Sequence, residues 1–129
     1  MEPSNAGSSV ALRDHVLRDL DALIQVIAEA RKDLRAYQSA LNKTRRHLEA
    51  GGRASDTSAL FDIASVRLTL SDRLNRIERV RSASRVSFWR LQVSEGKTIA
   101  DVARAWGFSR QLVSRALSRR EVQLTRSGR

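Results

Sequence analysis

The chain has 129 residues, of which 41% are hydrophobic and 29% charged, with no cysteine and a formal net charge of +10. This length suits one domain, or two small helical units that share a core, and the lack of cysteine excludes disulfides and thiolate-bound metals. Ten basic and three acidic side chains fall in residues 83–129, and such concentrated positive charge attracts polyanions, nucleic acid first and anionic membranes second.

The first long element is predicted to be a helix. Residues 1–9 are small and polar, and we expect them to be disordered. From Val10 to Ala50 nothing breaks a helix, and apolar residues recur in alternating steps of four and three, which is a heptad repeat with Leu20 at position a. The a and d positions should form a seam against a second helix or a second chain. The expected seam residues are Val16, Leu20, Leu23, Ile27, Leu34, Tyr37, Leu41 and Leu48.

A second helix should pack against the first. Gly51 and Gly52 are expected to end the first helix, and after a short polar loop the apolar residues of 60–80 again lie three or four apart. A loop this short favours an antiparallel helical hairpin over residues 10–82. The hairpin can close on itself or join a second copy, and we expect both together as a four-helix bundle. The serines of 82–84 mark either a junction or a helix that continues with a changed face.

Three short helices are expected in residues 85–120. The first covers roughly Val86 to Val93 and stops before Lys97. Thr98 is a typical N-cap for the next helix, and Asp101 lies three residues later, near the positive end of the helix dipole.

The helical pattern is then interrupted after Trp106 and resumes at once. Gly107 suits a turn, because a left-handed backbone conformation costs little only for glycine. Ser109 can cap the last helix, residues 109–119, and residues 121–129 form a basic tail that we expect to be frayed.

Residues 99–110, IADVARAWGFSR, resemble the C-terminal DNA-binding domain of invertase/resolvase-type site-specific recombinases and are similar to sigma-factor region 4. The resemblance extends over residues 85–120 only. The first 80 residues look helical and lack the α/β catalytic domain of the recombinases. The resemblance therefore implies docking on DNA through a helix-turn-helix, and it implies nothing about strand cleavage.

In such domains the second helix of the motif enters the major groove, and its N-terminal residues meet base edges. Arginine can contact guanine through two hydrogen bonds, and glutamine can contact adenine in the same way. The resemblance thus makes 109–119 the recognition helix. The expected base-contacting residues are Ser109, Arg110, Gln111, Ser114 and Arg115, and the expected phosphate-contacting residues are Lys97, Arg104, Arg119 and Arg120.

Other kinds of chemistry have little support in the sequence. There is no glycine-rich phosphate loop, no plausible Ser-His-Asp partnership, and no metal-ligand spacing around His15 and His47. We therefore expect no enzyme activity, cofactor, metal or small-molecule effector. No apolar run approaches the roughly 18–20 residues that span a bilayer, and no signal peptide is recognisable, so we expect no membrane contact and a cytoplasmic location at the nucleoid.

Together these features predict an all-α protein with a long N-terminal helical hairpin and a C-terminal trihelical helix-turn-helix domain. We expect a homodimer that binds double-stranded DNA sequence-specifically, most simply as a bacterial transcriptional regulator. Two alternatives stay open. In the first, the protein is an adaptor whose small domain binds a polymerase or sigma surface. In the second, it coats the nucleoid without sequence preference.

Overall fold

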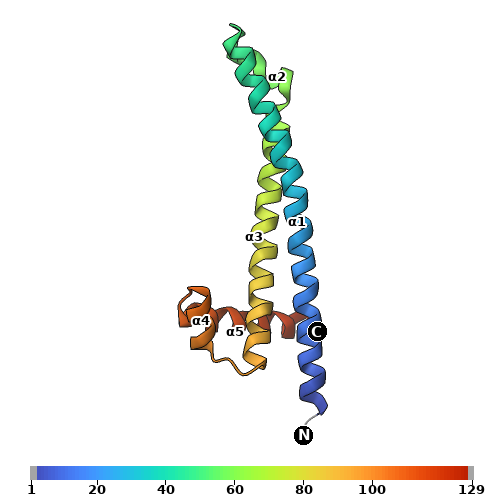
Figure 1. Cartoon of the computed structure of the whole chain (residues 1–129), viewed down its shortest axis with the longest axis vertical. Coiled ribbons are helices and arrows are strands. Elements are labelled where there is room, and N and C mark those ends of the chain that lie inside the picture. The colour runs from blue at the N-terminus through green and yellow to red at the C-terminus, as the bar shows by residue number, and fades with distance from the viewer. Residues whose placement is uncertain (1–2, 128–129) are drawn as a thin grey trace. The chain divides into compact units, whose positions relative to one another are not determined.

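The computed structural model describes the backbone of residues 3–127 and the side chains of residues 8–119. Helices make up nearly all of this range, and no strand occurs within it, so the predicted all-α class is confirmed. The elements in chain order are α1 (Pro3–Glu49), the 3-10 turn η1 (Ala54–Asp56), α2 (Thr57–Phe61), α3 (Ile63–Ser94), α4 (Ile99–Trp106) and α5 (Arg110–Ser127). Figure 1 labels the five α-helices.

Two helix boundaries differ from those expected, and a third, left open by the sequence, is decided. α1 begins at Pro3, so residues 3–9 are helical rather than disordered; proline is tolerated in a first helical turn because its missing N–H has no partner there. α3 runs without a break through the serines of 82–84, which confirms the continuing helix of the two alternatives left open there and makes the first helix expected in residues 85–120 the last turns of α3. α5 continues to Ser127, which includes most of the tail expected to fray; residues 128–129 lie outside the described range.

Contacts divide the chain into two compact units. The central unit is Ala22–Val80, and the terminal unit joins Met1–Asp21 to Arg81–Arg129. The central unit therefore holds the paired stretches of α1 and α3, and the terminal unit holds the last turns of α3 together with α4 and α5.

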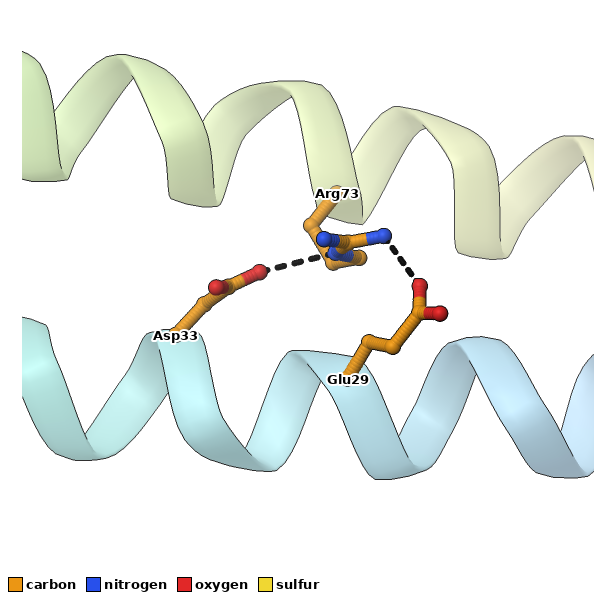
Figure 2. Close-up of polar contacts among 3 residues, drawn as sticks. All are labelled: Glu29, Asp33 and Arg73. Atoms are coloured by element: carbon orange, nitrogen blue, oxygen red, sulfur yellow. Dashed lines mark hydrogen bonds and ion pairs between the residues drawn. The ribbon is translucent and has the colours of Figure 1, made fainter.

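In the central unit, α1 and α3 are antiparallel neighbours (Figure 1). Arg73 of α3 reaches two carboxylates of α1: its Nε donates a hydrogen bond to Asp33 Oδ2 at 2.8 Å, and its Nη1 forms an ion pair with Glu29, as Figure 2 shows. These interactions, the hydrogen bond to Asp33 first, raise the pKa of Arg73. Because Glu29 and Asp33 are four residues apart on one helix, one guanidinium can contact both, and this fixes how the two helices are aligned.

The side of α1 that faces inward in the central unit agrees with the expected seam only in part: the d positions lie inward and the a positions do not. Its fully buried apolar residues are Val26 and Ala40, at position g of the heptad, and Ala30, at position d. Leu23 and Tyr37, at d, are half-buried. The a-position residues Ile27, Leu34, Leu41 and Leu48 remain 45–49% exposed, so in the single chain they are not part of the seam between α1 and α3.

The end of α1 is set by glycine, as predicted. Gly51 has φ +88, a left-handed conformation, and the Gly52 N–H donates to the His47 carbonyl at 2.9 Å. The His47 ring, at position g of the heptad, is half-buried. It lies edge-on to Phe61 of α2 at 6.0 Å between ring centroids. At position g it belongs to the same inward line as Val26 and Ala40.

In the terminal unit, the core is built where the last turns of α3 meet α4 and α5. Trp89 and Val113 are completely buried, and Val102 and Ala103 nearly so. Ala103 lies in the contact between α4 and α5, where a small side chain lets two helices approach closely. The half-buried residues around this core are Val86, Ile99, Phe108, Ala116 and Leu117.

Aromatic rings fill the space beside this core. The Trp89 ring is edge-on to Phe108 at 5.4 Å and to Trp106 at 6.0 Å between centroids. Trp106 is only partly buried, and its Nε1 donates to Gln92 Oε1 at 3.1 Å. The rings of Trp106 and Phe108 therefore pack edge-on against Trp89 as part of the hydrophobic core of a small three-helix arrangement.

Candidate nucleic-acid interface

The start of α4 is fixed by a capping box, in which Thr98 is the N-cap that the sequence predicted. The backbone N–H of Asp101 donates to Thr98 Oγ1 at 3.0 Å, and the backbone N–H of Thr98 donates to Asp101 Oδ2 at 3.3 Å. Hydrogen bonding to Thr98 is the main reason that the pKa of Asp101 is lowered, and an ion pair with Arg104 adds to it. Two otherwise unpaired donors of the helix start are therefore satisfied locally.

The turn between α4 and α5 depends on Gly107. This residue has φ 74 and ψ 27, the left-handed conformation expected of it. The Phe108 N–H then donates back to the Ala103 carbonyl at 3.0 Å. A Cβ built at Gly107 would meet nothing within 4 Å, so it is the backbone conformation and not lack of space that favours glycine here.

Ser109 starts α5. Its Oγ accepts a hydrogen bond from the Leu112 N–H at 3.1 Å, and its carbonyl accepts one from the Val113 N–H at 3.2 Å. The predicted cap is thus confirmed. A hydroxyl has one donor and two acceptor sites, so Ser109 can still offer its hydroxyl proton and one lone pair to a ligand.

The two sides of α5 differ sharply. Val113 is completely buried, and Ala116 and Leu117 are half-buried toward the core. The opposite side is polar and open. All five expected base-contacting residues are exposed, and four of them, Arg110, Gln111, Ser114 and Arg115, line one surface hollow of about 530 Å³.

The four expected phosphate contacts do not share one environment. Lys97 is exposed in the turn before α4. Arg104 is also exposed, but its Nη2 donates to Asp101 Oδ1 at 2.8 Å, so a phosphate would compete with that carboxylate. Arg119 lies on the α3 side of α5, where it lines a separate cavity of about 400 Å³ together with Trp89 and Leu112. The side chain of Arg120 lies outside the described residues.

Two further arginines of the terminal unit were not predicted to have a role from the sequence. The guanidinium of Arg85 lies over the rings of Phe108 and Trp89, at 4.8 and 5.6 Å from their centroids. The Arg90 Nη2 donates to the Leu117 carbonyl at 3.2 Å and ties α3 to α5. The spacing of Arg85 four residues before Trp89 is the one signal that points to such stacking.

Membrane-spanning helices and clusters of metal-ligating side chains are both absent from the described part of the chain. None of its helices combines the length and apolar character needed to cross a bilayer. Nor do three acidic or histidine side chains gather there in a way that could hold a metal ion.

Comparison of the chain with protein-family models, curated proteins and solved structures found no match. The function of the chain is therefore inferred from its own geometry and chemistry.

Proposed function

We propose that the protein is a dimeric, sequence-specific double-stranded DNA-binding protein that regulates transcription, with α4 and α5 as a helix-turn-helix and α5 as the recognition helix. One observation carries the proposal. The exposed side of α5 presents two arginines, a glutamine and a serine around one hollow, while the buried Val113 holds the opposite side to the core.

The residue types on this surface match the chemistry of the major groove. Arg110 and Arg115 can each donate two hydrogen bonds to guanine, and Gln111 can pair with adenine. A helix is also the element whose width fits that groove. The many basic residues of 83–129 would attract the phosphate backbone regardless of sequence.

Phosphate contacts would then orient the helix. Lys97 lies just before α4, and the first N–H groups of α5 are donors at the positive end of a helix dipole. Arg104 would reach a phosphate only by sharing or leaving Asp101. Arg119 is a weaker candidate for a phosphate contact than Lys97, because Arg119 lies beside α3 and away from the hollow on the exposed side of α5.

The test is selection of bound duplexes from a random DNA pool, followed by fluorescence anisotropy on the selected and on random duplexes at two salt concentrations. We expect Gln111→Ala to cost about 1–3 kcal/mol on the selected duplex and to relax preference at one base position. Binding to random DNA should change little. Affinity of the wild type should fall steeply as salt rises.

Arg79→Ala is the matched control, because Arg79 is an exposed arginine of the central unit and its loss should leave base preference unchanged. Equal losses for Gln111→Ala on both duplexes would contradict its role in base reading. Strong binding without any enriched sequence would favour a nucleoid-coating protein. Absence of binding even at low salt would favour an adaptor that binds a polymerase or sigma surface.

A further inference from the structure

The a-position residues of α1 form a regular row that its own chain leaves open. Ile27, Leu34, Leu41 and Leu48 are seven residues apart, and each is 45–49% exposed. We call them the a-row. Such uniform half-exposure means that one side of each side chain is covered by its own unit and the other side is open.

The buried residues Val26, Ala30 and Ala40 form the inward line of α1. One flank of this line is charged, and the other is apolar. Ile27 comes one residue after the buried Val26, and Glu29 comes three residues after Val26. Since each residue turns the helix by about 100°, these two lie on opposite flanks. The flank with Glu29 carries the ion pairs to Arg73 (Figure 2). The flank with Ile27 carries the a-row.

α3 adds to the apolar flank. Leu74 follows Arg73 of the inward line by one residue, as Ile27 follows Val26, and it is 48% exposed. In an antiparallel pair, equal offsets from the inward lines lie on the same face. The same offset from the half-buried Val66, Leu70 and Ile77 places the polar Arg67, Ser71 and Glu78 beside Leu74. The open face is therefore two helices wide, with its apolar row on α1 and a mostly polar border on α3, and a single partner helix would cover only part of it.

The central unit buries few apolar side chains completely. Val26, Ala30 and Ala40 are fully buried and small, the larger Leu23, Tyr37, Leu70 and Ile77 are only half-buried between the helices, and the side chains of the a-row are more exposed still. Two helices that bury so little apolar volume gain little stability from packing. A second layer of helices would turn the a-row into the larger part of the core.

We infer that the a-row docks on the a-row of a second copy of this chain, so that two α1–α3 pairs pack as a four-helix bundle. This rests on the dimer of the proposed function and identifies its interface. A row that repeats every seven residues fits a row with the same repeat, and twofold symmetry supplies one.

The size of the face agrees with a dimer. From Ile27 to Leu48 the row rises roughly 30 Å, and two helices side by side are roughly 20 Å wide. That area, on the order of 600 Å², is close to the ~800 Å² per partner of a stable protein interface.

The first test is the mass of the chain in solution, measured by analytical ultracentrifugation. We expect the wild type to sediment as two chains of 14.5 kDa, and Leu41→Arg to raise the dimer dissociation constant about 100-fold or more, because a charge would be buried at the centre of the interface. Leu68→Arg is the matched control: Leu68 is 54% exposed but lies on the outer side of α3, so the mass should not change. Helical circular dichroism checks that both variants fold.

The second test uses the absence of cysteine. The double variant Leu34→Cys/Leu41→Cys should form a disulfide-linked dimer on mild oxidation, in either relative orientation of the two chains. The two positions are two helical turns apart, roughly 10 Å, which is too far for a bond within one chain. Leu68→Cys should give little linked dimer.

The outcomes separate the interface from the function. A wild-type monomer at high concentration would overturn both the dimer and its interface. A dimer that persists in Leu41→Arg would overturn the interface alone. DNA binding is measured independently, so its failure would leave the interface standing.

Discussion

Single residues decide where the chain turns on either side of α4. Thr98, Gly107 and Ser109 each act through the backbone: two side chains accept N–H groups at helix starts, and one glycine supplies a left-handed conformation. Each effect is local, within three residues, which is why sequence reasoning found all three. None of the three lines the hollow formed by Arg110, Gln111, Ser114 and Arg115. Together, however, they set the direction of α5.

At this scale we predict that Gly107→Ala destabilises the terminal unit by about 1 kcal/mol, because alanine resists the left-handed conformation. Gly107→Asn should cost less, since asparagine tolerates that conformation better. Urea unfolding followed by tryptophan fluorescence measures this unit specifically, because both tryptophans, Trp89 and Trp106, belong to it. Equal stability of the wild type and the alanine variant would contradict the prediction.

At the scale of elements, charged side chains have two roles: they stabilise the start of one helix, and they align two helices. The capping box at the start of α4 holds a carboxylate against backbone donors, and Arg104 neutralises it. The Arg73 cluster instead links two helices, because Glu29 and Asp33 lie one turn apart on α1 and face α3. The first interaction can be predicted from spacing, whereas the second needs residues some forty positions apart to meet.

The lowered pKa of Asp101 leads to a pH prediction for α4. A carboxyl whose pKa is lower in the folded state stabilises the fold above its unfolded pKa of about 3.9, and that contribution is lost as the pH falls through the folded pKa. Asp101→Asn should therefore be less stable than the wild type at pH 7, and the difference should shrink toward pH 3. The measurement is the urea midpoint by tryptophan fluorescence at both pH values.

Thr98→Ser serves as the control for this prediction, because it keeps the hydroxyl that bonds to Asp101 and should keep the wild-type pH dependence. A constant difference between Asp101→Asn and the wild type from pH 7 to pH 3 would mean that the Asp101 charge does not act on stability.

For the whole molecule, the proposed interface and the proposed recognition helix are coupled by covalent linkage. A dimer that carries two recognition helices gains affinity on DNA with two half-sites, because the second contact forms at high effective concentration. Twofold symmetry makes inverted half-sites the natural target. DNA selection measures the separation of the half-sites.

We predict that Leu41→Arg weakens binding to a duplex with two half-sites by about 100-fold or more, while binding to a single half-site changes only a few-fold. Fluorescence anisotropy on the two duplexes measures this, with Leu68→Arg as the control expected to match the wild type. A similar loss on both duplexes would indicate that the substitution acts on DNA contacts and not through dimerisation.

The sequence by itself determined the helical class, the positions of the caps and the glycine turns, because these depend on neighbouring residues. It also showed the heptad period, but not which flank of α1 faces inward. Positions g and a are adjacent in the heptad, so period alone does not choose between them. Position g includes the polar Asp33 and His47, and the pattern therefore favoured position a for the buried side. Only the tertiary structure supplied their partners, Arg73 and Phe61. Those contacts make the polar line the inner one, and they leave the leucines of the a-row on the outside.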